Sequence, residues 1–93
     1  MSKSSSTAAD ATALMENLML RIIQALVDYP DAVRIQVLRD NGTSLIRVHV
    51  SPTDIGKVVG KQGRTARSLR TVAGAIGMKM RHRFALDIVD EGG

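Results

Sequence analysis

The residues best suited to chemistry in this 93-residue chain lie in one short segment, where two glycines enclose a lysine and a glutamine. Gly60 and Gly63 have no side chains, so an anionic strand can approach the main chain closely there. Lys61 supplies a mobile positive charge and Gln62 a neutral hydrogen-bond donor. A helix that begins after the second glycine would add the partial positive charge of its first amide groups. The segment therefore predicts a site for phosphate groups.

Two glycines at this spacing are weak evidence without their surroundings. The chain has 8 glycines, and Gly74 and Gly77 show the same spacing. The residues between this second pair are apolar, and Gly77 stands where a helix is expected to end, a place where glycine is common for conformational reasons. The charged middle of the first pair is what favours a ligand site there.

Basic residues are concentrated around the first glycine pair. From Lys57 to Arg83 there are eight bases and no acid, although the whole chain carries a net charge of only +4. Arg64, Arg67 and Arg70 follow one another at three-residue steps, so they keep one flank of a helix positive. Such a block attracts polyanions, among which nucleic acid is the commonest, and a merely solvated helix face is the alternative.

Several classes of function are disfavoured by composition. The absence of cysteine excludes disulfides, thiolate chemistry and sulfur-ligated metals, and it fits a reducing, cytoplasmic environment. The longest apolar runs are far too short to span a bilayer, and no secretory signal is visible. His49 and His82 are candidates for an acid and a base in RNA cleavage, but no third group is identifiable to orient them. We therefore expect neither an enzyme nor a bound metal or cofactor.

The spacing of apolar residues predicts the elements of secondary structure in the first half of the chain. A helix is expected from about Thr12 to Asp28, before Pro30 ends it. Two alternating strands follow, joined by a hairpin turn at Asn41 and Gly42. The apolar stripe of the helix is Leu14, Leu18, Ile22 and Leu26, with Met15, Met19 and Ile23 beside it.

The second half is expected to hold two helices and one strand. Ser51 and Pro52 open a short helix that runs into Gly60. A longer helix follows over 64–76, capped by Gly77, and then a strand that turns Phe84, Leu86 and Ile88 inward. This order predicts an α+β fold with a three-stranded mixed sheet and helices on one face. The expected division is a disordered tail over 1–12, one domain over 13–90 and a disordered end over 91–93.

The run from Val58 to Arg64, placed between two helices, resembles the GxxG signature of the KH family of RNA-binding domains. The order α-β-β-α-α-β is similar to the type II arrangement, and the length resembles that of the small bacterial stand-alone KH proteins of the KhpA kind. The resemblance implies a shallow groove that holds about four unpaired nucleotides. It also implies that Ile55, Val58 and Val59 form the groove floor, unless they are ordinary core residues. Ala66 departs from the larger residue common in the family, which predicts modest affinity and low sequence specificity.

These observations predict a non-catalytic protein that holds single-stranded RNA, as an RNA chaperone or post-transcriptional regulator, with single-stranded DNA as a possible substitute. The alternative is an assembly module whose basic face is incidental. On the second long helix Thr65, Ser68, Val72 and Ala75 form a stripe of small or apolar residues suited to close helix contact. The KH resemblance implies a homodimer and a larger KH-containing partner, so both interpretations are compatible.

Overall fold

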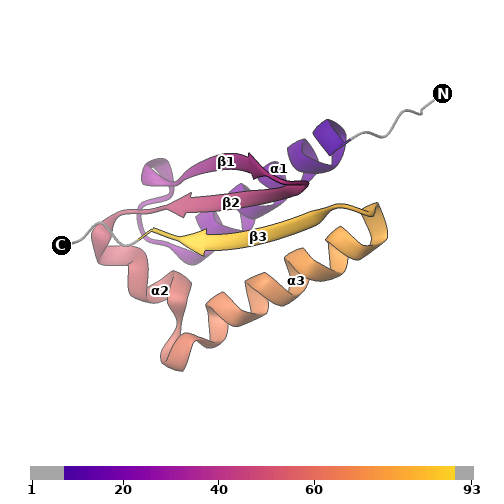
Figure 1. Ribbon diagram of the computed structural model, residues 1–93. Helices are drawn as coiled ribbons and strands as arrows, with labels where there is room; N and C mark the ends of the chain where they lie inside the picture. Colours follow the sequence, from indigo (N-terminus) through magenta and orange to yellow (C-terminus); the bar gives the residue numbers. More distant parts are fainter. Residues whose placement is uncertain (1–7, 90–93) are drawn as a thin grey trace.

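The computed structural model describes residues 8–89 and places nine short elements along them (Figure 1). Three α-helices and three strands form the fold: α1 (Ala8–Leu26), β1 (Arg34–Asp40), β2 (Thr43–His49), α2 (Ile55–Val59), α3 (Arg64–Met80) and β3 (Arg83–Ile88). Three 3₁₀ turns at Pro30–Ala32, Pro52–Asp54 and Lys61–Gly63 connect them. This is the expected α-β-β-α-α-β order of the type II KH fold.

The sheet is three-stranded and mixed, in the order β1-β2-β3. β1 and β2 are antiparallel and close at the pair Asp40 and Thr43, while β3 lies parallel to β2 with Arg83 opposite Thr43. The hairpin turn is the predicted one, because Asn41 and Gly42 both have positive φ, as a type I′ turn requires. The predicted α+β class with a mixed sheet is therefore confirmed.

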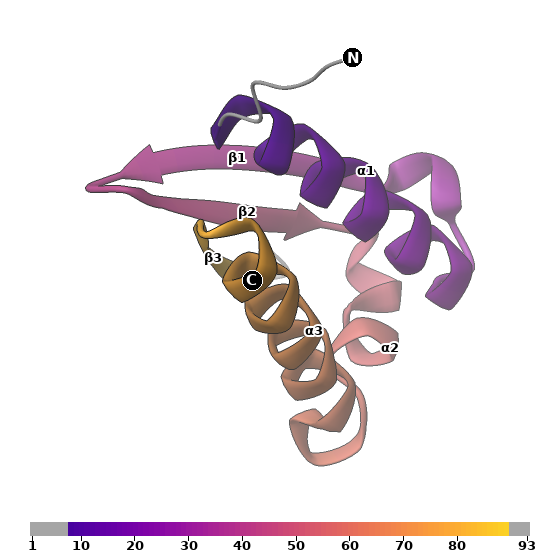
Figure 2. The same cartoon turned by 90° about the vertical axis from the view of Figure 1, so that its right-hand side faces the viewer.

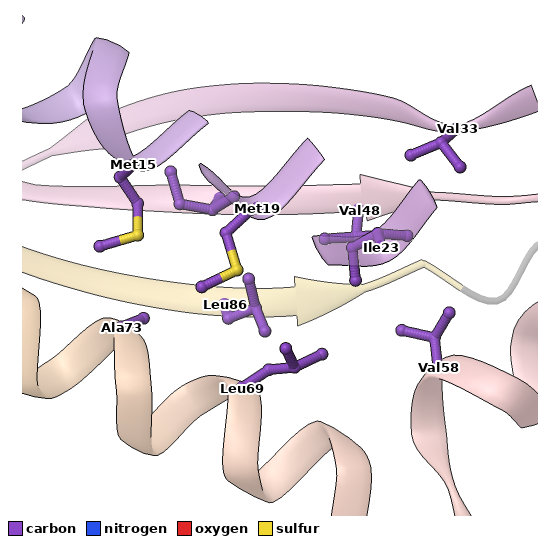
Figure 3. Packing of buried hydrophobic residues seen from close by; sticks show 10 residues of the cluster. Met15, Met19, Ile23, Val33, Val48, Val58, Leu69, Ala73 and Leu86 are labelled. Atoms are coloured by element: carbon purple, nitrogen blue, oxygen red, sulfur yellow. The ribbon is translucent and has the colours of Figure 1, made fainter. Parts of the chain in front are cut away.

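The helices and the inner face of the sheet enclose one core. Met15, Met19 and Ile23 of α1 are fully buried and point toward the strands, as do Leu69 and Ala73 from α3 (Figure 3). Figure 2 shows α2 lying between the C-terminal end of α1 and the N-terminal end of α3. The position of α2 matters for the candidate site, because this short helix carries the chain into the Gly60–Gly63 loop.

The stripe of α1 that faces the core differs from the predicted one. Met15 and Met19 are fully buried, whereas Leu14 is 52% exposed and Leu26 is 37% exposed. Both stripes repeat every four residues, and only the placement of the helix on the sheet decides between them. The helix also begins at Ala8 rather than near Thr12. Ala11 and Thr12 are already buried, and the hydroxyl of Thr12 lies 3.4 Å from that of Ser44 in β2. Of the expected disordered ends, residues 1–7 and 91–93 lie outside the described residues, as does residue 90 at the end of the expected domain.

The end of α3 also differs from prediction. The helix continues through Gly77 to Met80 and is capped by Arg81 in the left-handed conformation, with φ of 57°. Gly77 does not cap the helix; it is buried because the turn into β3 passes directly over it. A Cβ on Gly77 would lie 2.5 Å from the carbonyl oxygen of His82. Glycine at this position therefore allows two backbone segments to lie close together. The spacing of residues along the sequence does not reveal such a contact.

Candidate nucleic-acid interface

The Gly60–Gly63 loop turns sharply between α2 and α3, and glycine is required at its first position. Gly60 has φ of 80° and ψ of 169°, a conformation found almost only in glycine. A Cβ there would also lie 2.7 Å from the Cβ and 2.8 Å from the backbone nitrogen of Thr65. The loop therefore folds back tightly on the first turn of α3.

Backbone hydrogen bonds fix the rest of the loop. The amide of Gly60 donates to the carbonyl of Gly56 at 2.8 Å, and the amide of Gly63 donates to the carbonyl of Gly60 at 3.0 Å. Gln62 and Gly63 both adopt left-handed backbone angles, with φ of 56° and 75°. These angles leave the side chains of Lys61 and Gln62 exposed at the tip of the loop.

The basic residues of α3 have different surroundings. Arg64 and Arg67 are exposed, and the guanidinium of Arg64 donates to Oε1 of Gln62 at 3.4 Å. Arg70 instead donates from Nε to the carbonyl oxygen of Leu86 at 3.1 Å. Leu86 lies in β3, one of the two edge strands, so Arg70 ties α3 to that edge of the sheet. The loop and the first two turns of α3 thus form the exposed basic surface.

Lys57 is held by two carboxylates beside the loop. Its ammonium nitrogen lies 3.2 Å from Oδ2 of Asp28 and 3.6 Å from Oδ1 of Asp54. The hydrogen bond and the charge of Asp28 raise the pKa of Lys57 above its usual 10.5, and Asp54 adds to the effect. Much of its positive charge is therefore balanced within the chain.

Asp54 directly precedes α2, and its surroundings show that it connects two parts of the fold. The carboxylate is fully buried and accepts hydrogen bonds from the backbone amides of Asp28 at 3.2 Å and Tyr29 at 3.0 Å. Ser51, the predicted cap of this helix, makes no side-chain capping bond. Asp54 thus joins the end of α1 to the start of α2, a link that local sequence patterns do not indicate.

The three apolar candidates for the groove floor do not share one environment. Val58 is fully buried in the core, which matches the alternative interpretation of it as a core residue. Ile55 and Val59 are half-buried and therefore reach the surface on α2. Ala66, on the facing side of the loop, is almost fully buried. Only Ile55 and Val59 of this set are available to a ligand in this conformation.

The two histidines considered for catalysis are not brought together. Nε2 of His82 lies 2.8 Å from Oγ of Ser44, and its ring packs edge-on against Phe84. His49 ends β2, whereas His82 precedes the strand that begins opposite Thr43. The length of β2, about 20 Å at the usual rise per residue, separates them. The described residues also contain no cluster of three or more histidine, aspartate or glutamate side chains suited to a metal ion.

Comparison with known proteins identifies the family. The family model for the KhpA/KhpB KH domain matches residues 16–88. The chain belongs to the KhpA/KhpB KH-domain family. The match begins within α1 and extends to the end of β3, and it includes the GxxG loop between α2 and α3.

Individual relatives of the KhpA/KhpB family are similar over most of the chain. RNA-binding protein KhpA of Halalkalibacterium halodurans is 51% identical over 77 residues, which are 82% of this chain and all of that protein. RNA-binding protein KhpA of Caldanaerobacter subterraneus is 40% identical over 81% of this chain and all of the relative. That of Aquifex aeolicus is 46% identical over 70% of this chain and 82% of the relative.

Within residues 8–89, no helix has the length and apolar character needed to span a membrane.

Proposed function

We propose that this protein binds single-stranded RNA at the loop Gly60–Gly63 and along the exposed basic start of α3. The observation that carries the proposal is the geometry of the loop. Its two outer positions bear no side chains, and its two middle side chains, Lys61 and Gln62, project into solvent. A sugar-phosphate strand can therefore lie against the main chain while Lys61 balances a phosphate. The names of the relatives, RNA-binding protein KhpA, support the same function.

The other proposed contact residues contribute to different degrees. Arg64 and Arg67 extend the positive surface along α3, and Ile55 and Val59 offer a small apolar floor for bases. Val58 supports the floor from within the core. Lys57 contributes less than Lys61, because Asp28 and Asp54 already neutralise much of its charge.

Low sequence specificity follows from the kinds of contact that this surface offers. Phosphate contacts and backbone approach position a strand without distinguishing bases. Phe84 and Tyr29, the only aromatic residues, lie outside the loop and α2, so stacking of bases near the loop is weak. We infer a role as an RNA chaperone or post-transcriptional regulator in the cytoplasm, with single-stranded DNA as a weaker substitute ligand.

A double substitution in the loop tests the proposal. Lys61→Asp with Gln62→Asp places two anions where a phosphate should lie, so RNA binding is expected to fall below detection in a fluorescence-anisotropy titration. The matched control is Asn17→Asp with Arg21→Asp, which changes the net charge equally on the exposed face of α1. If the two variants lost RNA affinity equally, the loop would contribute only through its net charge, and this result would contradict the proposal.

The salt dependence of binding gives a second measurement. If about four phosphates are neutralised, the slope of log K against log salt for single-stranded RNA is about −3. A slope near zero would be incompatible with a phosphate-binding loop.

We also propose that α3 mediates self-association or pairing with a larger KH-containing protein. The observation in favour is the exposure of Val72, which is 42% exposed in the middle of a helix, with Ser68 and Ala75 exposed nearby. Val72→Glu should convert a dimer to a monomer in light scattering, whereas Thr71→Glu, on another face of the same helix, should not. A mass that is unaffected by Val72→Glu would remove this surface from consideration.

A further inference from the structure

A second concave surface lies at the opposite end of α3 from the GxxG loop. An open hollow of about 700 Å³ is bounded by the last turns of α3, the turn into β3 and the β1–β2 hairpin. In Figure 1 it corresponds to the region where α3 ends and β3 begins. The residues of its wall that matter here are Asn41 from the hairpin, Gly74 and Met78 from α3, and Arg81 and Arg83 beyond it.

The charge of this hollow is positive. Arg81 and Arg83 are both exposed, and the residues that line the hollow include no acid. Within residues 8–89 neither arginine has a carboxylate at ion-pair distance, in contrast to Lys57 beside the GxxG loop. The two guanidinium groups are therefore available to an anionic ligand.

The backbone conformation at Arg81 is one that glycine or asparagine adopts more easily. The turn from α3 into β3 therefore does not by itself account for an arginine at this position. Its amide donates to the carbonyl of Met78 at 3.4 Å, and the amide of His82 donates to the carbonyl of Gly77 at 2.9 Å. This is a Schellman motif, in which glycine or asparagine is the favoured residue at the left-handed position. An arginine with φ of 57° is a strained choice there. Gln62 in the GxxG loop is also a non-glycine residue with positive φ.

An apolar surface lies beside the two arginines. Met78 is 82% exposed, the largest exposed fraction among the large apolar residues that the structure describes as exposed. Next to it, Gly74 has open space where a side chain would lie. A flexible thioether next to a bare backbone can pack against a nucleobase of any identity. The hollow thus combines surfaces for a base and for phosphates.

One flank of α3 connects this hollow with the GxxG loop. Arg67, Arg70, Gly74 and Met78 recur at three- and four-residue spacing, so they share that flank. The hydrogen bond from Arg70 to Leu86 shows that the flank faces the outer edge of β3. Because α3 has 17 residues, the two ends are about 25 Å apart. A strand that occupies only four nucleotides at the loop does not reach the hollow, but a longer one does.

We propose that this hollow is a second nucleotide-binding subsite, which holds a distal nucleotide of the same RNA strand through Arg81 and Arg83. The inference rests on the proposed RNA-binding function and extends it. It predicts that affinity rises with RNA length beyond a tetranucleotide and that the increase depends on these two arginines.

The test compares tetrauridine with dodecauridine on the full chain. In the variant Arg81→Gly with Arg83→Gln, affinity for dodecauridine should fall at least about fivefold, and the salt slope should become shallower by about 1.4, since two phosphate contacts are lost. The amide shifts that tetrauridine induces at Gly60–Gly63 should remain as in the native chain. Since glycine adopts the left-handed conformation without strain, the melting temperature should not fall, so a loss of affinity cannot be assigned to unfolding.

A control variant separates this subsite from a general effect of charge. Arg21→Gln with Arg34→Gln removes the same charge from exposed positions on α1 and β1, and it should change dodecauridine affinity less than twofold. Equal losses in both variants, or no loss in the Arg81 and Arg83 variant, would overturn the subsite while tetrauridine binding still supports the GxxG loop. A variant that keeps RNA affinity but loses self-association in light scattering would assign the hollow to protein contact and also overturn it. If the native chain binds neither oligonucleotide, the proposed function itself fails.

Discussion

The ammonium nitrogen of Lys57 lies 3.2 Å from a carboxylate oxygen of Asp28, which joins α2 to the segment after α1. The same ammonium is 3.6 Å from the buried Asp54, so one lysine bridges two acids from different parts of the chain. Because α2 leads directly into Gly60, this bridge helps to fix the base from which the GxxG loop projects. Lys57 therefore has a structural role next to the proposed RNA-binding loop, independent of any contact with RNA.

The Lys57 bridge predicts a dependence of stability on pH at alkaline values. Asp28 and Asp54 raise the folded-state pKa of Lys57 above the ordinary 10.5. The stabilisation is then fully present below pH 10.5 and is lost as the pH rises through the folded-state pKa. The difference in unfolding free energy between the native chain and Lys57→Met should be constant from neutral pH to about pH 9 and should shrink above that range.

Urea titrations at several pH values measure this difference. Lys79→Met is a suitable control, because Lys79 is exposed and no carboxylate lies at ion-pair distance from it within residues 8–89. If the difference in unfolding free energy between the native chain and Lys57→Met grew with rising pH, this result would contradict a raised pKa for Lys57 in the folded state.

Substitution of Asp54 should lower the stability of the fold more than substitution of any exposed acidic residue. Asp54→Ala leaves the backbone amides of Asp28 and Tyr29 without their acceptor and Lys57 without one of its two partners. The free energy of unfolding should fall by about 2–4 kcal/mol. Asp54→Asn keeps one acceptor oxygen, so its free energy of unfolding should fall by less than that of Asp54→Ala.

Denaturant unfolding of Asp31→Ala provides the comparison for Asp54. Asp31 is exposed in the turn after α1, so its removal should change stability by no more than about 0.5 kcal/mol. Equal effects at the two positions would mean that the buried hydrogen bonds of Asp54 contribute nothing net.

The sequence allowed most of the architecture to be predicted, because the relevant signals are local. Alternating apolar residues on both sides of Asn41 and Gly42 determine the hairpin, and the break at Pro30 limits the first helix. The glycine pair with a charged middle located the loop between two helices for the same reason: turn chemistry acts within a few residues.

What the sequence did not predict depends on contacts between distant segments. The partners of Asp54 lie 25 and 26 residues earlier in the chain, and no spacing rule connects them. Likewise, the choice of Met15 over Leu14 for the core of α1 depends on how the helix lies across the sheet. The hollow beside Arg81 arises only where the hairpin and the end of α3 meet.

The three glycines around the GxxG loop should respond to alanine in a fixed order. Gly60→Ala meets Thr65 and requires a backbone conformation that alanine does not adopt, so it should cost at least about 3 kcal/mol. Gly63→Ala has open space but a left-handed φ, so it should cost about 1–2 kcal/mol. Gly56→Ala lies in α2 with nothing nearby and should stabilise by about 0.5–1 kcal/mol.

Thermal unfolding of the three loop variants gives this order directly. An equal or smaller cost at Gly60 than at Gly63 would show that the contact with Thr65 is relieved by a small shift of the loop. The geometry proposed for phosphate approach would then not be fixed by this glycine.

The second glycine pair provides a sharper contrast, because its two members lie on one helix at the same spacing as the pair in the loop. Gly74→Ala faces open space and should stabilise α3 by about 0.5–1 kcal/mol. Gly77→Ala places a Cβ 2.5 Å from the carbonyl oxygen of His82 and 3.3 Å from the ring of Phe84, so it should destabilise the fold by about 1–3 kcal/mol. In urea titrations the unfolding midpoint should rise for Gly74→Ala and fall for Gly77→Ala, while the dependence of unfolding free energy on urea concentration stays the same. Stabilisation by both substitutions would mean that the turn from α3 into β3 moves away without cost, and Gly77 would then be an ordinary helical glycine.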